Sequence, residues 1–319
     1  MINRRVLRIK VMQALYAFCQ NNNERVDLAE KKLIKNIWAI YDLYIHQLSF
    51  LIEIVDFARE TMEIQRNKHI PTQEEINPNT RFVDNSFIIR IENNPDYINK
   101  RDRLLINWAD QKDMIRRIFL KIRDDKEYKA YLKAPVCGQD EDQKILEYII
   151  DNYFAENDEL QQYFEEMNIF WADDFPIGCI MLIKTLKLMR LSEEKFEFLP
   201  PLFDNTSEED EKQDLMFVRD LFCKTILHSD KFDDLLEGKA KNWELERIAL
   251  IDSLILKMAL TEFIHCPSIP AKVTINEYIE LSKMYSTPKS KIFINGILDK
   301  LLIDLMDKKV IVKKGRGLV

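Results

Sequence analysis

The stretch that decides the fold is "VTINEYIELSKMYSTPKSKIFINGILDKLL", residues 273–302. Its apolar residues recur at intervals of three and four, which predicts two amphipathic helices. Thr274 and Glu277 have the spacing of a capping box, in which each side chain satisfies a backbone N–H of the other residue. Thr287 is the predicted N-cap of the second helix, with Pro288 at its first position, where the missing N–H costs nothing. These signals predict a helical bundle.

The same periodicity runs through most of the chain. Residues 64–100 are polar and contain prolines, so we expect a long loop or lid there, and residues 197–214 are a linker candidate. Gly296, inside the last predicted helix, suggests close helix approach. Because only 6 glycines and 10 prolines occur in 319 residues, the turns that many short strands need are missing. We therefore predict an all-α fold, whose other helices span about 3–18, 28–62, 102–134, 141–167, 174–192, 212–229 and 243–265.

Two parts of the chain resemble each other. Residues 114–132 are similar to residues 216–236, and each is followed downstream by an apolar segment that opens on a tryptophan, Trp171 or Trp243. Duplication of a helical hairpin would explain the similarity, as would coincidence between amphipathic helices. The matched pairs include Arg116 with Arg219, Phe119 with Phe222, and Tyr128 with Phe232.

The composition is that of a soluble globular protein, with 46% hydrophobic and 32% charged residues and a net charge of −7. We recognise no signal peptide and no run of about 18 apolar residues, so we expect a cytoplasmic protein that does not enter a membrane. The five cysteines show no spacing typical of disulfide frameworks or zinc sites. The histidines are scattered and no glycine-rich phosphate loop is present, so we expect no catalytic site, no cofactor and no metal. The cysteines are Cys19, Cys137, Cys179, Cys223 and Cys266, and the histidines are His46, His69, His228 and His265.

The amino-terminal segment "NRRVLRIKVMQALYAF", residues 3–18, has four positive charges and no acid, and the first acidic residue is Glu24. Arg4, Arg5 and Arg8 are expected on neighbouring turns of one helix. One interpretation is an ordinary solvated helix face. The other is a phosphate-contacting patch, because guanidinium groups without neighbouring carboxylates attract polyanions. Tyr16 would then offer a surface on which an unpaired base stacks.

Several segments resemble the transcription antitermination factor NusB family, in the family's order. They are "RRVLRIKVMQALYAF", "DLMFVRDLF", "ERIALIDSLILKMALTEF", "IPAKVTINEYIELSKMYS" and "SKIFINGILDKL". The resemblance covers residues 1–25 and about 213–305, and the intervening block far exceeds the short connection usual in the family. The predicted organisation is an Arg-rich first helix (1–25), a helical insertion with a polar loop near 64–100 (26–205), a C-terminal NusB-like bundle (206–306) and a basic tail (307–319).

The resemblance implies two small helical bundles that bind the single-stranded boxA sequence of ribosomal RNA leader transcripts, together with ribosomal protein NusE. That complex joins RNA polymerase and suppresses termination. Lys257 stands where relatives commonly have an arginine, and Lys289 where they often have an aspartate that helps choose bases; an ammonium group cannot accept from base amino groups. The implied RNA-binding residues are Arg4, Arg5, Arg8, Gln13, Tyr16, Lys257, Tyr285, Lys289, Ser290 and Phe293, and the implied partner-binding residues are Asp252 and Glu277.

Two other interpretations stay open. An RNA cytosine methyltransferase with a NusB-like domain would need a cofactor-binding α/β domain and a catalytic cysteine beyond the bundle. A helical protein-interaction scaffold without RNA binding is consistent with the net negative charge. The acidic inserted block is expected to face a protein partner or to stabilise the fold, rather than to contact RNA over most of its surface.

Overall fold

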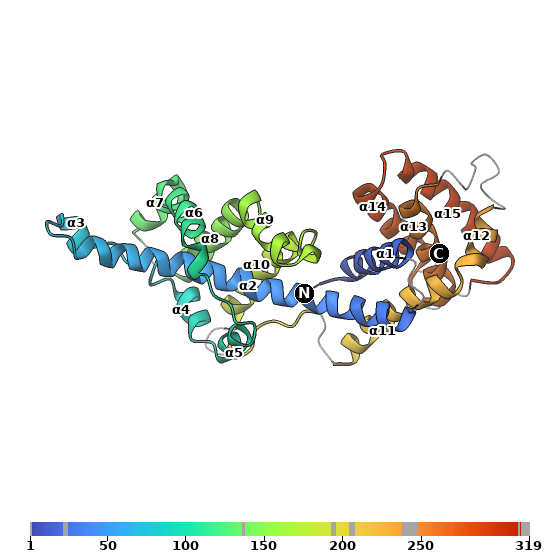
Figure 1. Cartoon of the computed structure of the whole chain (residues 1–319), viewed down its shortest axis with the longest axis horizontal. Coiled ribbons are helices and arrows are strands. Elements are labelled where there is room, and N and C mark those ends of the chain that lie inside the picture. The colour runs from blue at the N-terminus through green and yellow to red at the C-terminus, as the bar shows by residue number, and fades with distance from the viewer. Residues whose placement is uncertain are drawn as a thin grey trace. The chain divides into compact units, whose positions relative to one another are not determined.

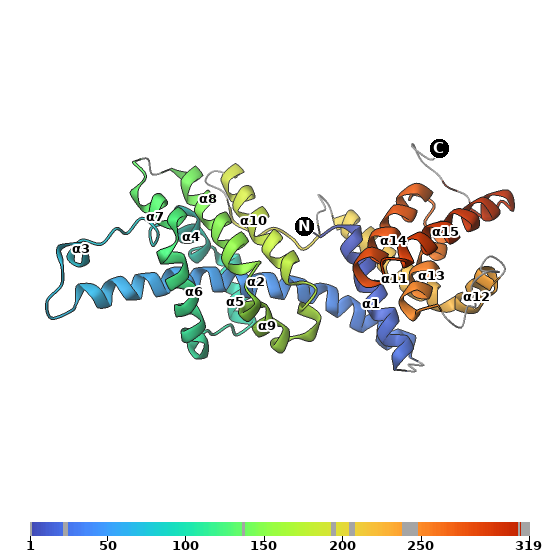
Figure 2. The same cartoon turned by 90° about the horizontal axis from the view of Figure 1, so that it is seen from above.

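The computed structural model describes residues 2–21, 25–135, 138–192, 196–203, 208–237, 248–311 and 313. These residues form helices, short turns and one isolated β-bridge, so the prediction of an all-α fold is confirmed. The chain forms two compact units, one from Trp38 to Leu202 and the other from Ile2–Ile37 together with the residues from Phe203 onward. Figures 1 and 2 show the helices of each unit from two directions. No helix in the described ranges has an apolar stretch long enough to cross a bilayer.

The unit that contains the amino terminus is organised around one apolar helix, α13. This helix is buried over most of its surface and packs against α1, α11, α14 and α15. The prediction of an amphipathic first helix is confirmed, since Leu7, Val11 and Leu15 of α1 are buried. The unit comprises α1 (Arg4–Gln20), the start of α2 (Val26–Arg66), α11 (Glu208–Leu227), α12 (Ser229–Glu237), α13 (Leu250–His265), α14 (Ala271–Tyr285) and α15 (Ser290–Asp307).

The first helix begins at a well-defined N-cap. The Asn3 side chain accepts hydrogen bonds from the backbone N–H groups of Arg5 and Val6, which have no partner within the helix. Ile2, just before the cap, forms a parallel β-bridge with Phe203. These contacts fix the start of α1 and thereby the backbone that carries the first two arginines.

The predicted starts of the last two helices are wrong. α14 begins at Ala271, so Thr274 lies inside the helix, where its hydroxyl donates to the buried carboxylate of Glu262 at 2.8 Å instead of capping. α15 begins at Ser290, whose backbone N–H is bonded to the carbonyl of Thr287 in a turn. In both cases a tertiary contact or turn outweighs a capping motif worth about 1 kcal/mol. Gly296 is also misjudged, because a Cβ at this position would meet nothing within 4 Å.

The second unit is organised around the rest of α2. The prediction of a long helix over residues 28–62 is confirmed, and its whole apolar stripe is buried. Leu33 and Ile37 of that stripe belong to the α13 unit, and the stripe continues in this unit with Ile40, Tyr41, Tyr44, Leu48, Leu51 and Val55. Aromatic contacts join α2 to its neighbours, as between Phe57 and Phe119, while Tyr44 shares a hydrogen bond with Thr185. The neighbours are α3 (Gln73–Ile76), α4 (Ser86–Glu92), α5 (Pro95–Arg103), α6 (Lys112–Asp124), α7 (Lys126–Lys133), α8 (Gln139–Ile149), a π-helical turn (Ile150–Phe154), α9 (Asp158–Met167) and α10 (Phe175–Leu191).

The prediction that residues 64–100 form a loop is wrong over its second half. Helices α4 and α5 lie there, and each starts at an asparagine cap, Asn85 and Asn94. They bury Phe87, Ile91 and Tyr97. Helices this short carry few periodic positions, and their asparagines and proline give the sequence the appearance of a loop.

The two similar stretches have the same local arrangement, a helix followed at once by a shorter helix (α6 with α7, α11 with α12). The paired arginines are exposed and the paired aromatic residues are buried in both copies. Any two amphipathic helix pairs would share this pattern, so duplication stays a prediction. Trp243 lies outside the described residues.

Candidate nucleic-acid interface

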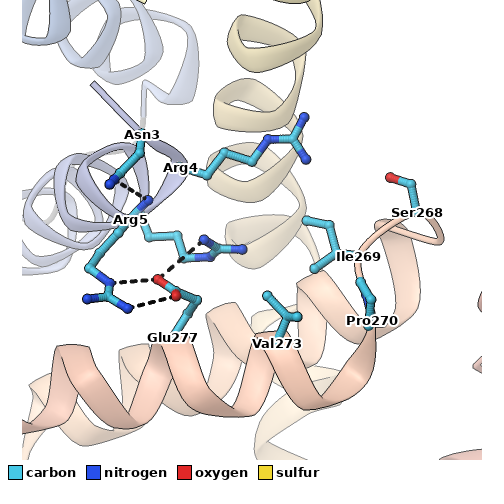
Figure 3. Close-up of a pocket in the computed structure, with 9 residues that line it drawn as sticks. Asn3, Arg4, Arg5, Ser268, Ile269, Pro270, Val273 and Glu277 are labelled. Carbon is cyan, nitrogen blue, oxygen red and sulfur yellow. Dashed lines mark hydrogen bonds and ion pairs between the residues drawn. The ribbon is translucent and has the colours of Figure 1, made fainter. Parts of the chain in front are cut away.

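The start of α1 lies beside an open pocket of about 500 Å³ (Figure 3). One wall comes from the first turns of α1, with three arginines. The loop between α13 and α14 and the first turns of α14 form the other. The lining residues are Asn3, Arg4, Arg5, Arg8, Ser268, Ile269, Pro270, Val273 and Glu277. All of them belong to the unit that contains α13.

Arg5 and Glu277 form a two-pronged ion pair across the pocket. The Arg5 Nε and Nη2 atoms donate to Glu277 Oε2 and Oε1, both at 2.8 Å. The Arg5 side chain is 44% exposed and that of Glu277 18%. The hydrogen bond to Arg5 lowers the pKa of Glu277, and the same bond raises the pKa of Arg5. The carboxylate is thus held in its charged form at neutral pH.

Arg8 lies beneath this pair and is 3% exposed. Its Nε and Nη2 atoms donate to the two carboxylate oxygens of Glu262 at 2.8 Å, and Glu262 is fully buried. Glu262 also accepts from the hydroxyl groups of Thr274 and Tyr278. Burial alone would lower the pKa of Arg8, but the hydrogen bond and charge of Glu262 outweigh it, so the pKa rises. A buried charge pair with these additional donors holds α1, α13 and α14 together.

Arg4 is the third paired guanidinium. Its Nε atom donates to Asp214 of α11 at 2.9 Å, while its guanidinium carbon lies 5.3 Å from the centre of the Phe217 ring. The three arginines therefore each face a carboxylate of the same unit. The sequence-based premise that this cluster has no neighbouring carboxylates is wrong, because the acids come from segments more than 200 positions away.

The other predicted site residues lie outside this pocket. Lys257 donates to Ser229 and to Asp233, and Ser290 is buried and donates to Asp252, which is itself buried. The structure thus does not bring the twelve predicted residues into one pocket: of these, Arg4, Arg5, Arg8 and Glu277 line it. Tyr16 and Lys289 are exposed, and Gln13, Tyr285 and Phe293 are half-buried.

Asp214 and Glu262 are two residues of this ion-pair cluster that the sequence-based prediction does not include. Glu262 carried a usable signal, because it is an isolated carboxylate in the apolar run of α13, and a buried charge needs a partner. Asp214 lies in a segment rich in acids, so nothing distinguishes it from its neighbours. Within the described ranges, no cluster of three or more His, Cys, Asp or Glu side chains has the arrangement of a metal site.

The comparisons with known proteins point to one family. Residues 181–302 match the model of the NusB family. Three proteins named "Transcription antitermination protein NusB" are similar: those of Salinibacter ruber (44% identity over 103 residues, 32% of this chain and 64% of the relative), Chloroherpeton thalassium (41% over 103 residues, 32% and 49%) and Myxococcus xanthus (36% over 104 residues, 32% and 74%).

The chain thus covers less than two thirds of the first two relatives and about three quarters of the third. A solved structure of T. maritima NusB matches 41% of this chain and 92% of its own length, with 26% identity and a TM-score of 0.28. The identity to the Myxococcus protein, over most of that protein's length, is sufficient to assign the family. The chain belongs to the NusB family, and its additional N-terminal helices fit an insertion into that family's sequence.

Proposed function

We propose that this protein is a transcription antitermination factor that binds boxA RNA of nascent ribosomal RNA leaders. It would do so with ribosomal protein NusE, within an RNA polymerase complex in the cytoplasm, and without catalysing a reaction. The observation that supports this best is the pocket at the start of α1, where the guanidinium groups of Arg4 and Arg5 are both accessible. Guanidinium groups that remain accessible bind phosphate through paired N–H donors.

In this proposal Arg4 and Arg5 contact the RNA backbone, and Lys257 and Lys289 add positive charge further along the strand. Three aromatic side chains, Tyr16, Tyr285 and Phe293, stack on bases or border them. Arg8 and Ser290 act from within the fold, because both side chains are buried. Gln13 lies on the same helix as the arginines, and Glu277 is assigned to the NusE and RNA surfaces. Asp252, which is buried and accepts from Ser290, would support those surfaces from within the fold.

The experiment is RNA binding by Arg5→Ala, with Arg117→Ala as the matched control. Arg117 is also an exposed arginine paired with a carboxylate, Glu159, but it lies in α6 of the other unit. Arg5→Ala should lose about tenfold in affinity for a boxA oligonucleotide, because one bidentate phosphate contact is removed, and Arg117→Ala should bind like the parent.

Salt dependence gives a second readout. If three to five phosphates are contacted, log K should fall with log salt with a slope of about −2 to −3.5 for single-stranded RNA. Arg5→Ala should reduce that slope by about 0.7, one phosphate's share. Equal affinities of parent and Arg5→Ala at every salt concentration would remove the assignment.

A helical protein-interaction scaffold is the second candidate. It is favoured by the carboxylate partners of all three arginines, which partly neutralise the basic cluster. Affinity capture with and without ribonuclease separates the two functions. Partners of a scaffold should persist after ribonuclease treatment, whereas leader RNA should be recovered only from untreated samples if the protein binds RNA.

A further inference from the structure

Glu277 lies between two guanidinium groups that differ in exposure. Its carboxylate accepts both hydrogen bonds from the exposed Arg5 (Figure 3). Oε2 of the same carboxylate lies 3.7 Å from Nη1 of the buried Arg8. Arg8 uses Nε and Nη2 for Glu262, so Nη1 is the nitrogen that faces Glu277. A small movement of the Glu277 carboxylate would therefore bring it into hydrogen-bond contact with Arg8.

Nε and Nη2 of Arg5 donate to Glu277 and together form one edge of the guanidinium group. Such an edge can also bind a phosphate in bidentate geometry. A carboxylate is planar and a phosphate is tetrahedral, but each presents a pair of acceptor oxygens to a guanidinium. The two anions therefore cannot occupy this edge of Arg5 together. The Arg5–Glu277 pair is also part-exposed, so breaking it costs little compared with the buried pair of Arg8.

From this geometry we propose that Glu277 is an internal substitute for an RNA phosphate. In the free protein it occupies the bidentate edge of Arg5. When RNA binds, a backbone phosphate takes that edge, and Glu277 moves onto Nη1 of Arg8. Glu277 thereby lowers RNA affinity and makes binding at Arg5 an exchange of one anion for another. This inference rests on the proposed RNA-binding function.

Competition between Glu277 and phosphate and a supporting role of Glu277 predict opposite effects on RNA affinity when the Glu277 charge is removed. If Glu277 only oriented Arg5 for RNA, removing its charge would weaken binding. If it competes with phosphate, Glu277→Gln should strengthen binding by about fivefold, which corresponds to about 1 kcal/mol at 1.4 kcal/mol per tenfold.

Glu280→Gln is the matched control, because this substitution removes the same charge from α14. Glu280 lies about one turn after Glu277 and forms its ion pair with Lys283 instead of Arg5. Its gain should be smaller than that of Glu277→Gln. The Arg5→Ala variant supplies the second control: in that background, Glu277→Gln should no longer raise affinity, since the edge over which the anions compete is gone.

The measurement is the dissociation constant of a fluorescent boxA oligonucleotide for the full-length chain and its variants at fixed salt. A gain for Glu277→Gln that exceeds Glu280→Gln and vanishes with Arg5→Ala supports the exchange. An equal gain in both glutamine variants, or weaker binding by Glu277→Gln, overturns it. If the parent protein does not bind RNA at all, the proposed function fails first, and that outcome is distinct from a parent that binds but shows no Glu277 effect.

Discussion

At the residue scale, the pocket is defined by three ion pairs of increasing burial. Arg5 and Glu277 stand out in the sequence, because they belong to segments with recognisable family motifs. Their pairing does not, because the two residues are separated by 272 positions. The carboxylates of Asp214 and Glu262 are equally remote from α1, so a basic stretch that looks unopposed in the sequence is neutralised in the fold. Sequence reasoning thus identifies the candidate cations but not the anions that they face.

The buried pair predicts a large effect on stability. Glu262→Gln removes the buried negative charge that accepts two hydrogen bonds from Arg8, and its amide N–H₂ would oppose the guanidinium donors. Breaking a buried charge pair typically costs about 3–5 kcal/mol, so we expect a loss of about 3 kcal/mol in the free energy of unfolding. Urea unfolding followed by circular dichroism measures it. Glu280→Gln, on the exposed face of the neighbouring helix, should change stability by less than about 0.5 kcal/mol; equal losses in the two variants would contradict the prediction.

At the element scale, long helices are well predicted and short ones are not. The stripe of α2 repeats over eight buried positions, so its periodicity is unmistakable. Helices α4, α5 and α12 have seven to nine residues, which is too short for a helical repeat of apolar residues to be recognised among the surrounding polar ones. The chain passes between the two units twice. The first boundary, at Ile37 and Trp38, lies inside α2, where no change in composition marks it, and the second, at Leu202 and Phe203, lies within the predicted linker at 197–214. Helix starts are also poorly predicted, since weak capping preferences yield to tertiary contacts such as that of Thr274.

Two glycines in helices predict opposite results for the same substitution. Gly296→Ala should raise the free energy of unfolding by about 0.5–1 kcal/mol, because the site is open and alanine reduces the freedom of the unfolded chain. Gly178→Ala should lower it by about 1–3 kcal/mol, because the new Cβ would clash with the side-chain amide of Gln47. Gln47 is buried and its amide donates to the carbonyl of Phe175, so it is held in place. Thermal or urea unfolding compares the two variants with the parent, and a shift of the same sign in both would refute the argument.

At the scale of the whole molecule, the chain is acidic overall, yet its candidate interface is a small basic cluster. The net charge of −7 says little about RNA binding, because the acidity belongs to one unit: residues 38–202 hold 21 Lys and Arg against 31 Asp and Glu, whereas the rest of the chain holds 26 against 23 and is net positive. The family match over residues 181–302 covers most of the C-terminal part of the α13 unit and also the end of the Trp38–Leu202 unit, from within α10. It gives no account of residues 38–180, which supply the aromatic core of the Trp38–Leu202 unit.

That aromatic core predicts a pH dependence confined to one unit. His46 packs against Phe164 and Trp171, and burial lowers its pKa from 6.5 to about 4. Between these values the unfolded chain binds a proton that the folded chain does not, so the free energy of unfolding falls as pH drops from about 6.5 to about 4, by up to about 3 kcal/mol.

The His46→Phe variant isolates this contribution from the carboxylates that titrate in the same range. Tryptophan fluorescence reports mainly on this unit during urea unfolding at pH 5 and pH 7, because three of the four tryptophans, Trp38, Trp108 and Trp171, belong to it. The parent should lose more stability than His46→Phe on going to pH 5. Identical losses would show that His46 is not buried as a neutral side chain.

The pairing of Arg8 with a glutamate 254 positions later also determines the order in which the chain can fold on a ribosome. The Trp38–Leu202 unit is continuous, so it can close as soon as it has emerged from the exit tunnel. Helix α1 is synthesised first, but it cannot bury its apolar stripe or pair the Arg8 guanidinium until α11, α13 and α14 have been translated. A nascent or truncated chain that ends before α13 therefore exposes a helix with an apolar face and positive charge. We expect chaperones and proteases to recognise such a chain.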